Sequence, residues 1–192
     1  MKIKTSFLSI IIFISLFLSN SQFSIAALFS AAFHESGHII ASKICHIKFS
    51  SLSLNIFGAR LTKETELYSY NNEIIVCAAG PVANLILFLI SSLILTFYQN
   101  EFLLNISTSS LVLGILNLLP IDSFDGAHIL SATLNKTCPP YLTQKIMLFI
   151  SFIFVFSLWC FSIYLILKIS ASLSLFIFSA MLFAKIFISS EQ

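Results

Sequence analysis

Residues 31–42 read AAFHESGHIIAS and place three ionisable side chains, His34, Glu35 and His38, among apolar and small neighbours. Two histidines four residues apart project from one face of a helix, and such a pair can bind one Zn²⁺ at about 2.0–2.1 Å each. A glutamate beside the first ligand can act as general base toward a metal-bound water. Because ionisable groups inside a membrane are costly and usually mark function, the stretch predicts a metal site on a membrane-spanning helix.

The composition is that of an integral membrane protein. Of the 192 residues, 58% are hydrophobic and 9% are charged, whereas soluble domains carry about 25% charged residues. Since a spanning helix needs about 20 residues, the apolar runs predict an all-α polytopic membrane protein with about six transmembrane helices. The predicted spans are residues 5–18, 23–43, 74–97, 103–121, 142–167 and 169–189.

These spans predict a single membrane domain, residues 1–192. The lipid bilayer is therefore an expected partner of the chain. The net charge of +2 is too small to indicate binding to nucleic acid.

The positive charges predict how the chain is oriented in the membrane. Lys2 and Lys4 precede the first span, and a further group follows the second span, at Lys43, Lys48, Arg60 and Lys63. Positive charges favour the cytoplasmic side, so we expect a multi-pass protein of the cell membrane with its active site toward the cytoplasm. An alternative for the N-terminus is a signal peptide cleaved after Ala26.

A third metal ligand is expected on another helix, because hydrolytic zinc sites usually have three protein ligands and an open position for water. His34 lies toward the cytoplasmic end of the second span. The fourth span runs inward and ends in NLLPIDSFDGAHIL, residues 117–130, at a matching depth. Topology therefore selects this segment and leaves Asp122, Asp125 and His128 as candidates.

Three motifs in this order resemble those of the site-2 protease family of intramembrane zinc metalloproteases. They are HESGH at residues 34–38, Gly80-Pro81-x-x-Asn84, and Asn117-x-x-Pro120-x-x-x-x-Asp125-Gly126. Together they cover residues 31–130, and the resemblance implies a three-helix catalytic core at about 23–130 with additional helices at 5–18, 142–167 and 169–189. The chain departs from the family pattern at Phe124, where Leu is usual, at Ala127, where a second Gly is common, and at Asp122, where small residues or Pro are frequent.

The resemblance implies a role for each matched residue. It implies one Zn²⁺ held by His34, His38 and Asp125, with Glu35 as the catalytic base. Two neutral histidines, two carboxylates and the ion sum to zero charge, which makes the cluster cheaper to bury. The family pattern further implies that Asn117 and Asn84 contact the substrate backbone or the oxyanion. Three more residues are expected beside the ligands: Gly37, Gly126 and His128.

The predicted function is hydrolysis of a peptide bond within or near a transmembrane segment of another membrane protein. The alternative is a non-catalytic zinc-binding membrane protein or a metal transporter. Within the family, the six spans resemble the group that contains stage IV sporulation protein FB. No CBS or PDZ domain is expected in a chain that ends at Gln192, so any regulation is expected from a partner membrane protein or from substrate availability.

The segment LSLNIFGARL, residues 52–61, alternates apolar and polar residues and then turns around Gly58. This pattern predicts a short β-hairpin on the cytoplasmic side rather than a helix. The hairpin is interpreted either as a simple cap or as an edge strand, over residues 52–56, that binds an unwound substrate by strand addition.

Overall fold

A computed structural model describes the backbone of residues 2–5, 21–46, 49–55, 58–63, 69–122, 124–169 and 174–190. The chain divides into two compact units, residues 1–117 and 118–192. The predicted first span, residues 5–18, lies outside the described residues apart from Thr5, which ends a strand.

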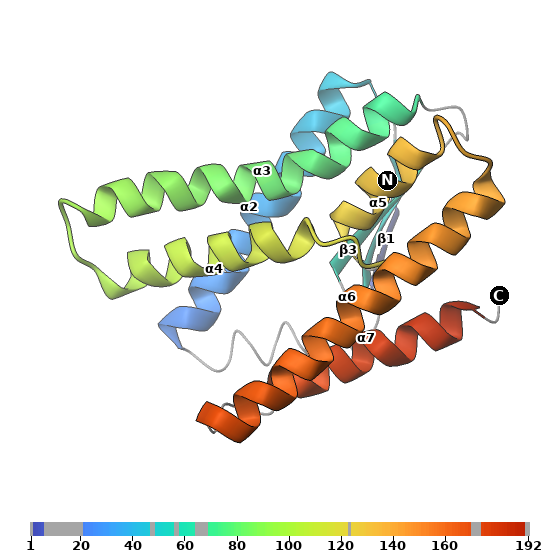
Figure 1. The fold of residues 1–192 in the computed structure, drawn as a ribbon. Coiled ribbons are helices and arrows are strands. Elements are labelled where there is room, and N and C mark those ends of the chain that lie inside the picture. The colour runs from blue at the N-terminus through green and yellow to red at the C-terminus, as the bar shows by residue number, and fades with distance from the viewer. Residues whose placement is uncertain are drawn as a thin grey trace. The chain divides into compact units, whose positions relative to one another are not determined.

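The first unit contains three strands and three helices. Its elements are β1 (Lys2–Thr5), α2 (Gln22–Ile44), β2 (Phe49–Asn55), β3 (Gly58–Lys63), α3 (Tyr70–Leu95) and α4 (Glu101–Asn117). Each of the three helices packs against the other two, and α3 and α4 run side by side in opposite directions (Figure 1). These are the three helices that the sequence predicts for the catalytic core.

The sheet has the order β1-β2-β3. β2 and β3 pair antiparallel with Asn55 opposite Gly58, so the strand pair lies where the sequence predicts it. β1 was not predicted; it pairs in parallel with β2, with Lys2 opposite Ser51. The sheet also corrects the prediction of an edge strand over residues 52–56. β2 is the central strand, because its backbone is paired on both sides, and the edges belong to β1 and β3.

Helix α2 carries the HESGH motif, and its ends differ by one residue from the predicted span of 23–43. The Ser21 side chain caps the helix by accepting a hydrogen bond from the Ser24 backbone N–H at 3.1 Å. At its other end the chain leaves the helix through His46, which has a φ of 54°. In mid-helix, a Cβ on Gly37 would lie 2.5 Å from the Ala79 carbonyl oxygen on α3. The lack of a side chain at Gly37 therefore lets α2 and α3 approach closely.

The second unit contains α5 (Asp125–Leu134), α6 (Pro140–Ile169) and α7 (Ser174–Ser190). α6 packs against both of the other helices. Aromatic rings join α6 to α7, with Trp159 at centroid distances of 6.2 Å from Phe176 and 6.3 Å from Phe183.

Helix α5 was not predicted. The sequence predicts that the fourth span continues to residue 121, whereas α4 ends at Asn117. Pro120 explains the difference, because proline has no N–H to donate and disfavours helical backbone in the residue before it. The chain then turns, and the Pro120 carbonyl accepts a hydrogen bond from Ser151 Oγ on α6 at 3.2 Å. A new helix begins at Asp125, whose carboxylate in the first turn complements the helix dipole.

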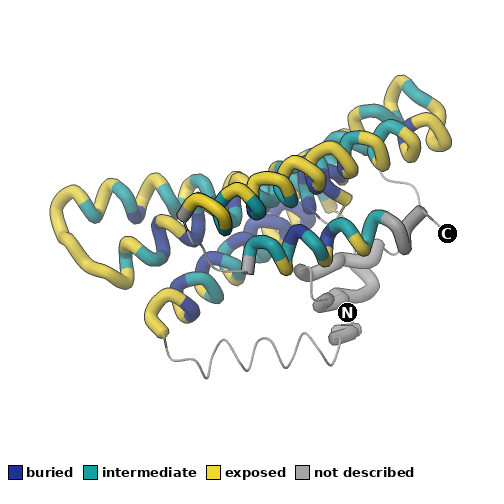
Figure 2. Tube along the Cα trace, turned by 60° about the horizontal axis from the view of Figure 1, so that its bottom comes forward, coloured by how far each residue is buried: buried dark blue, intermediate teal, exposed yellow. Residues whose placement is uncertain are grey.

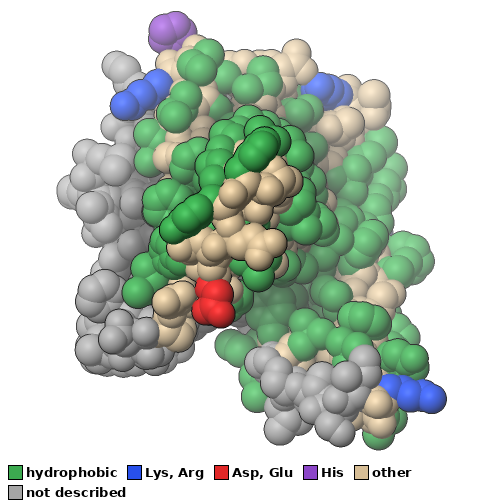
Figure 3. Space-filling model, turned by 90° about the vertical axis from the view of Figure 1, so that its left-hand side faces the viewer, with side chains coloured by type: hydrophobic (Ala, Val, Ile, Leu, Met, Phe, Trp, Pro, Cys, Tyr) green, Lys and Arg blue, Asp and Glu red, His purple; other side chains and the backbone are tan. Residues whose placement is uncertain are grey.

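The helices expose many large apolar side chains. On α3 these include Leu89 and Leu93, each 64% exposed, and on α6 Leu167 is 80% exposed. Much of the helix surface is drawn as exposed in Figure 2, and the face in Figure 3 is covered mainly by hydrophobic side chains. Apolar surface on this scale marks an interaction site or lipid contact rather than exposure to water.

Two of the described helices, over Tyr70–Leu95 and Pro140–Lys168, are long and apolar enough to cross a bilayer. The apolar helices over Glu101–Asn117 and Leu175–Ile186 are shorter. Polar residues of the HESGH motif reduce the mean hydropathy of α2. The number of six spans and the cytoplasmic position of the hairpin stay predictions.

Candidate metal centre

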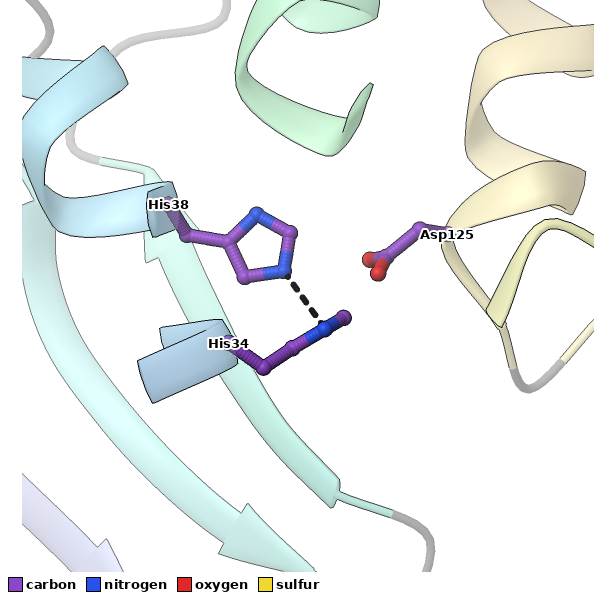
Figure 4. A group of neighbouring side chains, drawn as sticks. All are labelled: His34, His38 and Asp125. Atoms are coloured by element: carbon purple, nitrogen blue, oxygen red, sulfur yellow. Dashed lines mark hydrogen bonds between the residues drawn. The ribbon is translucent and has the colours of Figure 1, made fainter. Parts of the chain in front are cut away.

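The two histidines of the HESGH motif lie one turn apart on α2, and each is only 7% exposed. Their rings meet edge to face with centroids 4.8 Å apart. The two Nε2 atoms are 3.1 Å from each other, as the dashed line in Figure 4 shows. The nitrogen atoms of two separate imidazoles therefore converge on one point inside the first unit.

A backbone carbonyl of α3 determines which nitrogen of His38 carries a proton. His38 Nδ1 lies 2.8 Å from the Val76 carbonyl oxygen. Because a carbonyl oxygen can only accept a hydrogen bond, Nδ1 is the protonated atom and the neutral ring has its lone pair on Nε2. This is the tautomer that binds a metal through Nε2, with a backbone partner of the kind that commonly orients metal-binding histidines.

Gly80 leaves open the space into which both Nε2 atoms point. A Cβ built on this glycine would contact His38 Nε2 and would lie 2.7 Å from His34 Nε2. Gly80 is itself buried. The donor atoms and the missing side chain together fit a small cation with imidazole ligands, for which Zn²⁺ is a common choice.

Asn84 contacts the other histidine. Its side chain is completely buried, and its Nδ2 lies 3.2 Å from His34 Nδ1. Its Oδ1 is buried and has no hydrogen-bond partner among the residues that the structure describes. The predicted contact of Asn84 with substrate stays a prediction, but in this structure the amide faces a metal-ligand candidate.

The sequence did not reveal the part that α3 plays as a whole. Val76, Gly80 and Asn84 are spaced by four residues and so share one face of that helix. Val76 contacts His38, Gly80 lies beside the space between the two rings, and Asn84 contacts His34. A four-residue spacing of Gly and Asn after an apolar residue could have indicated a common face, but a carbonyl acceptor has no signature in a sequence.

Glu35 and Asn117 complete the predicted residues of the first unit. Glu35 follows His34 on α2 and is half-buried. Asn117 ends α4, and its Nδ2 donates a hydrogen bond to the Leu113 carbonyl within the same helix, at 2.9 Å. Their predicted roles as catalytic base and oxyanion or substrate contact stay predictions.

The second unit contains the acidic candidates for a third ligand. Asp125 is the first residue of α5 and is half-buried. A Cβ on the neighbouring Gly126 would contact the Leu118 carbonyl oxygen and lie 2.6 Å from that of Leu119. Gly126 therefore lets the chain fold back tightly beside Asp125.

The other two candidates of the 117–128 segment are less suited to bind a buried metal. Asp122 is 54% exposed and forms an ion pair with Lys185 of α7, with the nearest atoms 3.6 Å apart. His128 is exposed. Asp125 is the least exposed of the three, and its role as a metal ligand stays a prediction.

Comparisons with known proteins agree with this description. The model of peptidase family M50 matches residues 99–158, a region that includes Asp125 but not the HESGH motif. Among solved structures, the chain is similar to a site-2 protease from Methanocaldococcus jannaschii, with 21% sequence identity and a TM-score of 0.65. That match covers 96% of this chain and 88% of the other. No curated protein sequence matches the chain.

The buried histidine pair beside the long apolar helix α3 is a candidate metal centre. The family model matches less than half of the chain, and the solved structure shares its fold.

Proposed function

We propose that this protein is a zinc endopeptidase that hydrolyses a peptide bond within or near a transmembrane segment of another membrane protein. The observation that carries the proposal is the convergence of the His34 and His38 Nε2 atoms, 3.1 Å apart, over the space left by Gly80. Two lone pairs directed at one point are unfavourable without a cation or a shared proton. A metal ion that accepts both lone pairs would remove this repulsion.

The proposed ligands are His34, His38 and Asp125. His34 and His38 belong to the first unit and Asp125 to the second, and Figure 4 draws the three side chains. Two imidazoles and one carboxylate form a known ligand set of catalytic zinc, which leaves a position open for water. When bound, Zn²⁺ supplies Lewis acidity toward the scissile carbonyl and toward the attacking water.

Glu35 is the proposed catalytic base. It stands next to His34 on α2, and because neighbouring residues on a helix do not face the same way, Glu35 lies beside the ligands rather than among them. Its carboxylate would take a proton from the attacking water and pass that proton to the leaving amine. Asn117, at the end of α4, is the proposed hydrogen-bond donor to the substrate backbone or the developing oxyanion.

The proposed setting is a multi-pass protein of the cell membrane with the active site toward the cytoplasm. The sheet supports this orientation, because β1 and β2 pair with each other. Paired strands lie on one side of a membrane, and Lys2 and Lys4 of β1 therefore share a side with the hairpin and its Arg60 and Lys63. The positive charges gathered there favour the cytoplasm.

Metal removal tests the proposed function. The purified protein in detergent is expected to contain about one zinc per chain and to cleave some members of a panel of single-span substrates, since a catalytic zinc site holds one ion. Treatment with a chelator should abolish cleavage, and added Zn²⁺ should restore it. Cleavage that survives complete metal removal would contradict the proposal. Stable zinc binding with no cleavage, where an active family member cuts the same panel, would favour the non-catalytic alternative.

A further inference from the structure

We propose that Asn84 is a positioning residue for the metal ligand His34: its amide oxygen accepts the Nδ1–H of His34 and so holds the Nε2 lone pair toward the metal. This inference rests on the proposed zinc site. It differs from the substrate or oxyanion contact that the family resemblance implies for Asn84, and it follows from contacts within the first unit alone.

Asn84 is buried and lies close to His34. Asn84 is completely buried on α3, and its amide nitrogen lies 3.2 Å from His34 Nδ1. The amide thus contacts the ring nitrogen that faces away from His38, since the Nε2 atoms of the two histidines are the pair that meet. A group in this position acts on the ligand and not on a substrate.

The tautomer of His34 decides whether its Nε2 atom can bind a metal. If the Asn84 N–H donated to Nδ1, the neutral imidazole would carry its proton on Nε2 and could not bind a metal there. Rotation of the amide by half a turn presents Oδ1 instead, the buried atom that has no other hydrogen-bond partner within the described part of the chain. That oxygen can accept only from a protonated Nδ1, and the Nε2 lone pair is then left for the metal.

The equivalent contact at His38 supports the assignment. There the acceptor is the Val76 carbonyl oxygen, 2.8 Å from Nδ1, which selects the same tautomer. Val76 and Asn84 lie eight residues apart and therefore on one face of α3. The two histidines lie four residues apart on α2. One helix thus supplies an acceptor to each metal ligand on the neighbouring helix.

Zinc affinity of two variants tests the role of Asn84. Asn84→Leu keeps the approximate size but removes the acceptor, and we expect zinc affinity, measured by competition with a chromophoric chelator, to fall about 10–100-fold. Asn84→Asp keeps an acceptor oxygen and should retain the affinity of the unaltered protein. Ser91→Ala is the matched control, because Ser91 is buried on the same helix and, among the described residues, donates to the Leu87 and Phe88 carbonyls of that helix.

The outcomes separate this inference from the proposed function. Unchanged zinc affinity in Asn84→Leu, with a lowered kcat or a raised KM, would overturn the positioning role and favour substrate contact. Absence of zinc from the unaltered protein would overturn the metal site and the inference together. Loss of affinity in Asn84→Asp equal to that in Asn84→Leu would also contradict the role of the oxygen as acceptor.

The role of Asn84 can also be tested on the unaltered protein, so that the result does not depend on whether the variants fold. Nitrogen NMR of the zinc-loaded protein with ¹⁵N-labelled histidine reports which ring nitrogen carries the proton. We expect His34 and His38 both to have a protonated Nδ1 and a metal-bound Nε2. The signals of the other two histidines, His46 and His128, can be identified by replacing each with Gln. A proton on His34 Nε2 would overturn the proposal.

Discussion

Replacement of Glu35 by Gln is expected to lower the turnover of a transmembrane substrate by about 10²–10⁴-fold, the usual contribution of a general base. Gln has nearly the same shape as Glu but cannot take a proton from water. Bound zinc should stay at the level of the unaltered protein, because the residue beside His34 on a helix does not face the ligand site. Turnover and zinc content are to be measured on the same preparations.

Glu101→Gln is the matched control for this prediction. It removes the same charge from an exposed position at the start of α4 and should leave turnover unchanged. If Glu35→Gln cleaved as fast as the control, Glu35 would not be the base. If it lost its zinc as well as its activity, the result would indicate that Glu35 binds or supports the metal instead.

Replacement of Gly80 by Ala is expected to weaken zinc binding at least about 100-fold, the upper end of the effect of disturbing the groups around metal ligands. The added methyl group would contact His38 Nε2 and lie 2.7 Å from His34 Nε2. The rings cannot move aside easily, because their Nδ1 atoms are in contact with Val76 and Asn84 on α3. Zinc content after dialysis and cleavage activity are both expected to fall.

The backbone of α3 should stay helical in Gly80→Ala, because Ala favours a helix over Gly by about 1 kcal/mol, and the collision falls on the two imidazole rings. Helix content and the thermal midpoint by circular dichroism check this point. Gly114→Ala is the matched control: a Cβ there meets its nearest neighbours at 3.4 Å, an ordinary contact. Full zinc affinity in Gly80→Ala would show that the metal does not occupy the space above this glycine.

The sequence predicts the parts of this protein that depend on repeated spacing. The apolar run and the four-residue separation of His34 and His38 place α2 to within one residue at each end. The alternation of residues 52–55 around a Gly58 turn predicts the β2–β3 pair. Both signals are local, since helix and strand periodicity follow from the chain's own geometry.

The features that the sequence does not predict depend on contacts between distant segments or on backbone atoms. α5 is only ten residues long and follows an apolar run directly, so it reads as the end of the preceding span. β1 is four residues that become a strand only by pairing with β2, some 50 residues later in the chain. The Val76 carbonyl that orients His38 would be present with any residue at position 76.

Zinc content of three purified proteins tests the central claim, a zinc centre formed by His34, His38 and Asp125, most directly. The unaltered chain is expected to hold about one zinc, as a three-ligand catalytic site does. Asp125→Asn should lose most of this zinc, whereas Asp122→Asn should keep it, because Asp122 is exposed and paired with Lys185. Zinc retained in Asp125→Asn and lost in Asp122→Asn would contradict the ligand assignment.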